Sequence, residues 1–330
     1  MRDGEIAGEG YHHRAGETHA EVNALLAAGE NARGATLYVS LEPCNHHGRT
    51  PPCSHAVAEA GVTRVVIGAR DPNPKTNGGG IGYLRDRGIE VEIVEDPQAL
   101  AIVEPFACAI RAQRPYVSLK MAMSMDGFIA SQPGRQEWLT GEEAREYVRE
   151  LRIEHDAVAV GAGTVRVDNP QLTVRPAHHR LREYVRVVAC ETDAVDPASA
   201  VFASEAGYGK TIVLAPAGAS ARFTELHGVA DVILIGARNE IDLDMDAAFR
   251  ALRDRGINSV LCEGGPTMAG HLLAKGLVDR FHWLIAPRLL RSESAVPVVT
   301  AGALGDVRGL RFDRVEQLGR DVLVSGIIER

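Results

Sequence analysis

Short apolar runs alternate with amphipathic stretches over the first third of the chain. Runs rich in Val, Ile and Leu predict strands at 37–41, 62–68 and 90–94. Between them, apolar residues at helical spacing predict helices at 20–28, 54–60, 80–87 and 97–111, and Thr18 stands where a capping residue is expected for the first. Strands that alternate with helices in this way indicate a mostly parallel sheet with helices on its faces.

A second α/β pattern begins after Arg114-Pro115. Pro115 disfavours helix in the residue before it and is followed at once by an apolar strand-like run, 116–122. Further strands are expected at 157–161, 185–189, 211–215, 231–235, 259–262, 280–286 and 321–329, with helices at 141–154, 245–255 and 267–275. We therefore expect two α/β domains, residues 1–113 and 114–330, each long enough to bury its own core.

Composition and charge narrow the class of protein. A chain of 330 residues with 45% hydrophobic and 24% charged residues is typical of a soluble globular protein. The net charge of −8 argues against nucleic acid or an anionic membrane as partner. No apolar run approaches the roughly 18 residues of a membrane span. The five cysteines are odd in number and widely spread, and the chain does not open on an apolar signal segment, so we expect no disulfides and a cytoplasmic location.

The first residues contain a sequence typical of a hairpin turn but too few residues before it to form a strand. Asp3-Gly4 is a typical hairpin turn, but only two residues precede it. Either the true start lies upstream of Met1 or a leading strand has been lost. We favour a start codon assigned too far downstream.

His19, Glu21, Cys44 and Cys53 carry the strongest chemical signal. One imidazole and two thiolates give zinc three protein ligands and leave a position for water, which is the arrangement of a catalytic site. Zinc deaminases have His-x-Glu followed by Pro-Cys-x-x-Cys, with the glutamate as general acid and base. Here eight residues separate the two cysteines. The alternative, a structural zinc site or two buried free cysteines, fits less well because structural zinc usually has four protein ligands.

The segment Glu-Pro-Cys-Asn-His-His-Gly-Arg-Thr-Pro-Pro-Cys at 42–53 resembles the deaminase domain of the bacterial bifunctional riboflavin-biosynthesis family (RibD/RibG). The resemblance implies a cytidine-deaminase-like three-layer α/β/α domain that deaminates a phosphoribosylamino-pyrimidine. By this resemblance, zinc is bound by His19, Cys44 and Cys53, Glu21 shuttles protons, and the substrate is contacted by His12, His46 and Arg49.

The substrate roles also have a chemical basis. A cation such as Arg49 suits a phosphate group, and neutral imidazoles suit hydrogen bonds to a sugar. A solvated polar loop is the alternative for His12, His13 and His47. Members of the family carry an Asn-Pro-x-Val-Gly-type segment ahead of the hairpin turn, and this sequence lacks it.

Two glycine-containing segments follow strands in the second half. Val-Gly-Ala-Gly-Thr at 160–164 reads as a strand and a glycine turn, followed by a polar loop to Arg175. A Gly-x-Gly turn suggests dinucleotide phosphates, but the third glycine of the Rossmann fingerprint is absent, so that fingerprint does not apply. Glu-Gly-Gly-Pro-Thr at 263–267 lies between a strand and a helix, where free N–H groups can hold a phosphate. A tight turn serving backbone geometry alone is the alternative.

These segments resemble the reductase half of the same family, which implies a dihydrofolate-reductase-like α/β domain that uses NADPH. The resemblance places around the substrate Lys120, Trp138, Thr140, Arg152, Asp168, Leu172, Arg175 and Glu263, and near the cofactor Gly161, Thr164, Gly264, Gly265 and Thr267. Asp168 is the candidate for handling the opened ribose. Arg152 and Arg175 are candidates for binding phosphate or fixing carboxylates, and a surface ion pair is the alternative for either.

Three functions are compared. The first is a bifunctional enzyme that deaminates a small phosphorylated pyrimidine at a zinc site and then reduces its ribosyl group with NADPH. The second keeps only the reductase, with the first domain as a docking or oligomerisation module. The third, a nucleic-acid-editing deaminase, fits poorly with an acidic chain that is 5% aromatic. The resemblance also implies a homo-oligomer, and no role is assigned to residues 176–245.

Overall fold

The computed structural model describes residues 1–14, 16–74, 76, 78–174, 184–191, 194–204, 209–237, 242–300 and 309–329. Two compact units divide the chain, Met1–Gln113 and Arg114–Arg330. Within the described residues, no helix is both long enough and apolar enough to cross a membrane.

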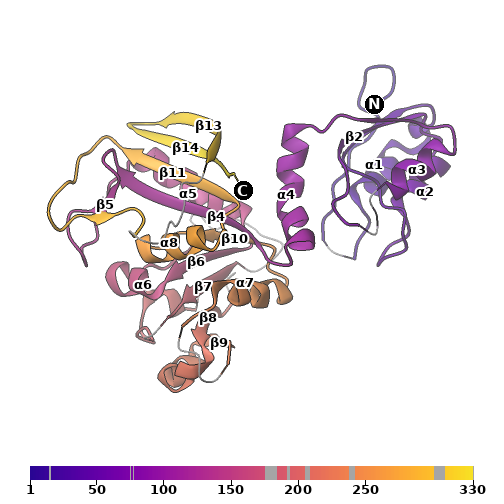
Figure 1. Ribbon diagram of the computed structural model, residues 1–330. Helices are drawn as coiled ribbons and strands as arrows, with labels where there is room; N and C mark the ends of the chain where they lie inside the picture. The colour runs from indigo at the N-terminus through magenta and orange to yellow at the C-terminus, as the bar shows by residue number, and fades with distance from the viewer. Residues whose placement is uncertain are drawn as a thin grey trace. The chain divides into compact units, whose positions relative to one another are not determined.

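The first unit is built on a parallel sheet of β1 (Thr36–Leu41), β2 (Arg64–Ala69) and β3 (Glu90–Ile93), in that order. Its helices are α1 (Ala20–Ala28), η1 (Gly29–Ala32), α2 (Cys53–Glu59), α3 (Gly79–Arg85) and α4 (Pro97–Arg111). Val65 and Ile67 of β2 pack with Val57 of α2 and Leu84 of α3. Contacts of α4 with β1 and β2 cover the other face, which gives three layers (Figure 1).

Residues 1–12 lie against the sheet edge and α1. The hairpin signal forms a tight turn, because Arg2 and Glu5 bridge across Asp3 and Gly4, whose φ angles are 52° and 87°. The amide of Thr36 donates to the carbonyl of Met1 at 2.9 Å. At Gly10 the chain approaches α1 so closely that a Cβ would lie 2.3 Å from the Ala24 nitrogen. This close packing explains why glycine is needed there.

Thr18 does not cap α1, contrary to the sequence prediction. The N-cap is His19, which makes no side-chain capping bond. The Thr18 hydroxyl instead donates to the side chain of Asn23 at 2.5 Å.

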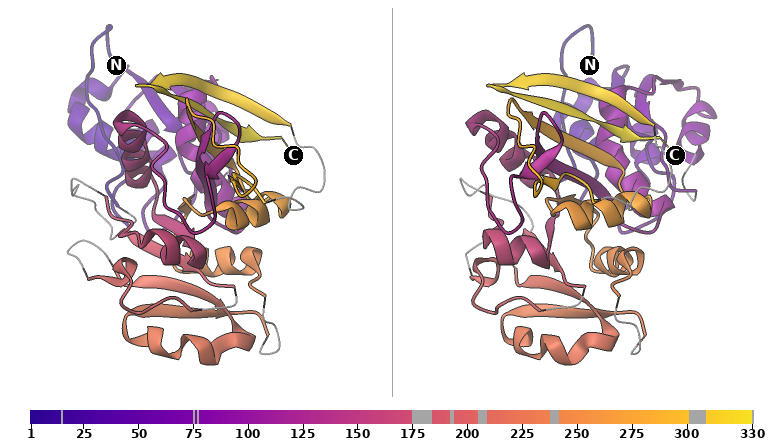
Figure 2. Two further views of the ribbon diagram at one scale, coloured as in Figure 1. Left: turned by 90° about the vertical axis from the view of Figure 1, so that its left-hand side faces the viewer. Right: turned by 60° about the vertical axis from the view of Figure 1, so that its left-hand side comes forward.

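The second unit contains a sheet of nine strands in the order β13-β14-β11-β4-β10-β6-β7-β8-β9. The parallel strands are β4 (Tyr116–Ser124), β6 (Ala157–Gly161), β7 (Val185–Ala189), β8 (Thr211–Pro216), β9 (Ala230–Ile235), β10 (Ser259–Cys262) and β11 (Arg280–Ala286). The hairpin of β13 (Leu310–Leu318) and β14 (Asp321–Ile328) adds antiparallel to β11. It lies at one end of the sheet, with β9 at the other (Figure 2). A separate pair joins β5 (Phe128–Ala130) to β12 (Val296–Pro297).

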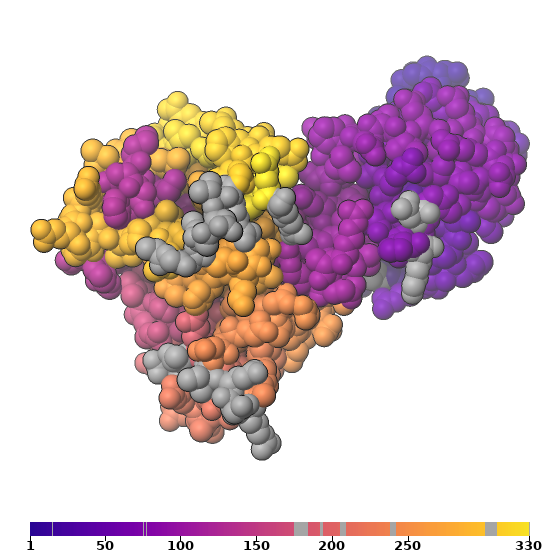
Figure 3. Space-filling model, in the orientation of Figure 1, coloured from indigo at the N-terminus to yellow at the C-terminus, as the bar shows by residue number. Residues whose placement is uncertain are grey.

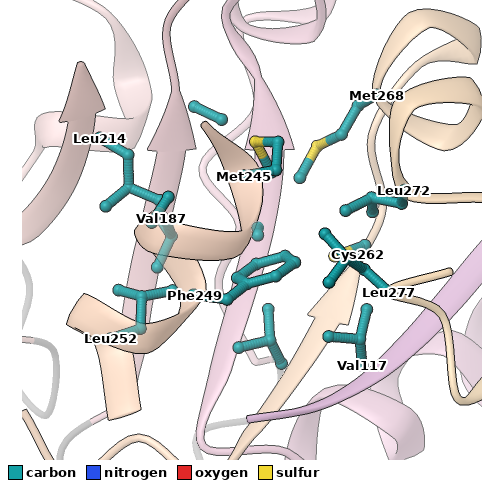
Figure 4. Packing of buried hydrophobic residues seen from close by; sticks show 14 of the residues in the cluster. Val117, Val187, Leu214, Met245, Phe249, Leu252, Cys262, Met268, Leu272 and Leu277 are labelled. Atoms are coloured by element: carbon teal, nitrogen blue, oxygen red, sulfur yellow. The ribbon is translucent and has the colours of Figure 1, made fainter. Parts of the chain in front are cut away.

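Helices cover both faces of this sheet. On one face, α7 (Met245–Asp254) and α8 (Pro266–Ala274) bury Phe249 and Leu272 against strand residues such as Val117 and Val187 (Figure 4). On the other face lie α5 (Glu142–Glu154), α6 (Ala162–Asp168) and η3 (Ala217–Gly228), and the short η2 (Ala200–Phe202) joins the same cluster. The sheet is therefore buried on both sides through most of its width.

The structure contains several elements that were not predicted from the sequence, among them η3, α6 and β13. Residues 162–168, predicted as a turn and polar loop, form the helix α6, whose Ala162 and Val165 are buried. Strand β13 was not predicted, because its residues are mostly exposed and mix charged with apolar side chains. Its side chains lie on the surface of the unit (Figure 3).

Candidate active sites

Three metal-binding side chains meet in the first unit. His19, Cys44 and Cys53 each offer one ligand atom, and these atoms lie within 4.8 Å of one another. His19 Nδ1 is 3.1 Å from Cys53 Sγ and 3.7 Å from Cys44 Sγ. Donors on one tetrahedral zinc ion are about 3.5 Å apart, given zinc–nitrogen and zinc–sulfur bonds of about 2.0 and 2.3 Å. One nitrogen and two sulfurs at this separation fit zinc.

Secondary structure brings these donors together. His19 precedes the first turn of α1, Cys53 is the first residue of α2, and Cys44 lies in the loop after β1. The Cys53 amide donates to Cys44 Sγ at 3.4 Å, and the Ser54 amide donates to the Cys44 carbonyl at 3.1 Å. The hydrogen bond from the Cys53 thiol lowers the pKa of Cys44 to about 5, so a thiolate is present at neutral pH.

Thr50 supports the orientation of His19. Its hydroxyl oxygen is 3.4 Å from His19 Nε2, while Nδ1 faces the two sulfurs. A partner on the second ring nitrogen of a metal-binding histidine holds the ring in place and fixes its tautomer. Nothing in the sequence pattern pointed to Thr50.

Glu21 lies beside the donors on the first turn of α1 and is 8% exposed. Burial raises the pKa of its carboxyl above the ordinary 4.5, against the opposing effects of its backbone hydrogen bond and of His19. A raised pKa makes a carboxylate a stronger proton acceptor than an ordinary glutamate, as a general base requires. This position fits the predicted proton shuttle.

Two of the donors, His19 and Cys44, line a cavity of about 310 Å³. Its wall includes all three predicted substrate residues of this unit, His12, His46 and Arg49, together with His19 and Cys44. His46 Nδ1 lies 3.3 Å from the Thr76 hydroxyl, and His12 Nδ1 lies 3.1 Å from the Thr18 carbonyl. His13 and His47 are absent from this lining, as the solvated-loop alternative predicts for them.

Glu42 holds the loop that carries Cys44 and was not predicted as a site residue. Its side chain is 2% exposed, and its carboxylate accepts hydrogen bonds from the amides of Asp71, Gly78 and Ile81 at 3.2–3.4 Å. Through these bonds the start of α3 is fixed beside Pro43-Cys44. At Gly80 a Cβ would lie 1.8 Å from the Pro43 carbonyl oxygen.

A larger cavity, about 1100 Å³, lies in the second unit. All the predicted substrate and cofactor residues of this unit that the structure describes line it, namely Lys120, Trp138, Thr140, Arg152, Asp168, Leu172, Glu263, Gly161, Thr164, Gly264, Gly265 and Thr267. Arg175 lies outside the described residues. The lining residues come from segments far apart in the sequence, so only the fold assembles them.

Three charged side chains meet in this cavity. Arg152 Nε and Nη2 donate to the two carboxylate oxygens of Glu263 at 2.5 and 2.9 Å, and their side chains are 19% and 10% exposed. Burial raises the pKa of Glu263, but the Arg152 guanidinium and the nearby Lys120 outweigh burial and hold it below 4.5. Burial lowers the pKa of Lys120, although Glu263 opposes this. Arg152 is therefore no surface ion pair and fixes a buried carboxylate.

Asp168 ends α6 beside a strained stretch of backbone. Burial raises the pKa of its carboxyl above the ordinary 3.8. Asn169 and Leu172 both have positive φ angles, 42° and 54°, and Leu172 is 4% exposed. Such backbone strain is common where a fold holds a functional segment in place.

The glycines before α8 permit close packing. A Cβ at Gly264 would lie 2.6 Å from Met268 Sδ, and one at Gly265 would lie 3.5 Å from Thr164 Oγ1. Pro266 is the first residue of α8, where its missing N–H costs nothing. Gly264, Gly265 and Thr267 therefore line the same cavity as Thr164.

The chain matches two family models, the RibD C-terminal domain over residues 115–324 and the cytidine and deoxycytidylate deaminase zinc-binding region over 1–69. It is 38% identical to the riboflavin biosynthesis protein RibD of Escherichia coli K12 over 336 residues, which covers 98% of this chain and 90% of that protein. The chain belongs to the RibD family.

Solved structures agree with this assignment. RibD of Acinetobacter baumannii has a TM-score of 0.84 at 34% identity and covers 100% of this chain and 91% of its own. The diaminohydroxyphosphoribosylaminopyrimidine deaminase/5-amino-6-(5-phosphoribosylamino)uracil reductase of Thermotoga maritima has a TM-score of 0.82 at 34% identity, covering 99% and 90%.

Membership in the RibD family confirms several sequence predictions. The two-domain α/β fold, with a deaminase-like and a reductase-like part, is confirmed. The protein is a riboflavin-biosynthesis enzyme with deaminase and reductase activities, and its cofactors are zinc and NADPH.

Proposed function

We propose that residues 1–113 hydrolytically deaminate 2,5-diamino-6-ribosylamino-4(3H)-pyrimidinone 5′-phosphate and that residues 114–330 then reduce the ribosyl group of the product to ribityl with NADPH. The observation that supports the first step is the meeting of His19, Cys44 and Cys53 beside the buried Glu21. The Thermotoga relative is named for this pair of activities.

In the deaminase unit, Glu21 moves the proton. Zinc held by the three donors would lower the pKa of a water to about 7. Glu21 takes a proton from the attacking water as the water oxygen bonds to the ring carbon, and gives a proton to the amino nitrogen as the carbon–nitrogen bond breaks and ammonia leaves. Arg49 binds the phosphate, and His12 and His46 hydrogen-bond the sugar or the pyrimidine.

In the reductase unit, the chain orients the substrate against the cofactor. NADPH supplies the reducing electron pair. Lys120 and the Arg152–Glu263 pair bind polar groups of the pyrimidine, and Asp168, which lines the same cavity, donates a proton to the ribose oxygen as the ring opens. Trp138, Thr140 and Leu172 complete the substrate wall, and Gly161, Thr164, Gly264, Gly265 and Thr267 contact the cofactor.

The partner is a small phosphorylated pyrimidine. The net charge of −8 disfavours nucleic acid and anionic membranes. A homo-oligomeric assembly and a cytoplasmic location stay predictions.

The variant Glu21→Gln tests the deaminase proposal. We expect it to keep stoichiometric zinc and to lose ammonia release by about 10³-fold, because proton transfer contributes about 10²–10⁴ to such reactions. Zinc is measured by elemental analysis and ammonia by a coupled assay. Glu59→Gln, an exposed acid on α2, is the matched control and should behave as the wild type.

Two outcomes would contradict the proposal. Zinc-loaded wild-type protein that reduces the pyrimidine but releases no ammonia would favour the reductase-only alternative. Undiminished ammonia release by Glu21→Gln would remove Glu21 from the mechanism.

A further inference from the structure

Glu191 is an acidic side chain on the wall of the large cavity that no step above uses. It follows β7 by two residues and lines the cavity together with Gly161, Gly163, Thr267 and His271. Its carboxylate Oε1 lies 2.7 Å from His271 Nδ1, and the two side chains are 44% and 48% exposed. Both are therefore within reach of a bound molecule.

Strand order gives the position of this pair relative to the substrate residues. The parallel strands run β4-β10-β6-β7. Lys120 lies on β4, Glu263 follows β10, Gly161 ends β6 and Glu191 follows β7. Three strand spacings separate the ends of this series, about 14 Å. If the reacting end of NADPH lies near Lys120 and Glu263, and its phosphates near the glycines at the centre, its adenosine end extends towards Glu191.

The local topology supports this placement. Gly161 opens a turn into α6, and the chain returns through the parallel neighbour β7, where Gly161 pairs with Ala189. The order strand, helix, parallel neighbouring strand also occurs in Rossmann units, where an acid at the end of the second strand accepts a hydrogen bond from the ribose 2′-hydroxyl of NADH, whereas a cation takes the 2′-phosphate of NADPH. The comparison concerns this strand order alone, because the glycine fingerprint is absent here. Glu191 occupies the acid's position.

Arg166 and His271 lie at the same end of the cavity as Glu191. His271 is four residues after Thr267 on α8, so both lie on the same helix face. Arg166, exposed on α6, also lines the cavity and interacts electrostatically with Cys190, next to Glu191. A 2′-phosphate at this end therefore meets the guanidinium of Arg166, the imidazole of His271 and one carboxylate that repels it.

We propose that Glu191 sets the choice between NADPH and NADH, because its carboxylate opposes the 2′-phosphate and accepts a hydrogen bond from a free 2′-hydroxyl. His271 is a positioning residue that holds this carboxylate in place. The inference rests on the proposed use of a nicotinamide cofactor in this unit.

The test uses two fragments of the cofactor and the full-length protein. Adenosine 2′,5′-bisphosphate carries the 2′-phosphate, and adenosine 5′-monophosphate carries the free 2′-hydroxyl. Calorimetry should show that Glu191→Gln binds the bisphosphate about tenfold more tightly and the monophosphate no more tightly than the wild type, because a like charge has been removed. His271→Ala should weaken the bisphosphate about tenfold and leave the monophosphate within twofold. Glu225→Gln, an exposed acid outside the cavity lining, should change neither.

If Glu191 and His271 had only a structural role, their substitution would change the affinities for both fragments in the same direction. The inference would be overturned if the affinities for the two fragments changed together or if neither affinity changed. The ratio of kcat/KM for NADPH to that for NADH is the second readout and should rise about tenfold in Glu191→Gln. The affinities for the two fragments could change in opposite directions in a protein that does not reduce the pyrimidine substrate. That result would refute the proposed reductase function but not the role of Glu191.

Discussion

Glu263 keeps a charge in a place where water is largely excluded. Its two carboxylate oxygens accept hydrogen bonds from Nε and Nη2 of Arg152, and Lys120 adds a second positive charge nearby. The partners are 111 residues apart in the chain, so the pair connects α5 to the loop after β10. The residue types were predicted for this site, but their pairing and the lowered pKa follow from packing.

The pH dependence of stability follows from this pair. The pKa of Glu263 in the folded state lies below the ordinary 4.5 of the unfolded chain. Its charge therefore stabilises the folded state fully above pH 4.5, and this stabilisation is lost as the pH falls through the folded-state pKa. At neutral pH we expect Glu263→Gln to unfold with about 2 kcal/mol less free energy than the wild type, because Arg152 keeps its charge without a charged partner. Below pH 4.5 the difference should shrink, because the unfolded wild-type chain then takes up a proton at residue 263 before the folded protein does.

Both tryptophans of the chain, Trp138 and Trp283, lie in the second unit, so their fluorescence reports its denaturation alone. Glu225→Gln is again the control and should match the wild type at every pH. A stability difference that stays constant down to pH 3 would show that the charge of Glu263 contributes nothing.

At the scale of elements, close approaches position the sites. In the first unit, α3 can lie against the Pro43-Cys44 segment only because residue 80 is glycine. In the second, Gly264 allows α8 to pack against the end of β10, and Met268 fills the space. Because such contacts are closely packed, a displacement of α3 or α8 must also displace the adjoining loop, which carries Cys44 in the first unit and Glu263 in the second.

The variant Gly80→Ala tests this coupling. Its methyl group would overlap the Pro43 carbonyl, so α3 or the Cys44 loop must move, at a cost of about 1–3 kcal/mol. We expect weaker zinc retention against a competing chelator and slower ammonia release. Gly82→Ala, on the exposed side of the same helix with no atom within 4 Å, should be neutral or stabilising by up to about 1 kcal/mol. Equal behaviour of the two variants would refute the coupling.

At the scale of the whole molecule, two units keep separate cores and separate chemistry. The cluster around Ile67 and Leu84 belongs to the first unit alone, and the clusters around Phe249, Phe223 and Leu284 belong to the second. Among the described residues, the metal-binding group lies entirely within the first unit.

Removal of zinc should therefore affect one activity. We expect dipicolinate treatment to abolish ammonia release while NADPH-dependent reduction of the already deaminated pyrimidine stays within twofold of the untreated rate. Both reactions are followed on the same preparation, and ammonia release should return when zinc is added back. Parallel loss of both activities would show that the reductase depends on the metal.

The sequence by itself determined the residue types and the order of elements. Few side chains bind zinc, so His19, Cys44 and Cys53 stood out, and apolar runs predicted the parallel strands on which both cavities are built. Helix α6 and strand β13 were missed, because a short helix at a glycine turn and an exposed edge strand lack the usual apolar period.

Only the tertiary structure decided which groups meet and which charges they carry. Thr50 beside His19, Glu42 beneath the Cys44 loop and Glu191 beside His271 left no pattern in the sequence, because each pairs with residues remote in the chain. The raised pKa values of Glu21 and Asp168 arise from burial, which depends on the assembled fold. The periodicity of apolar residues depends only on residues near one another in the sequence. Desolvation and ion pairing depend on which residues the fold brings together in space.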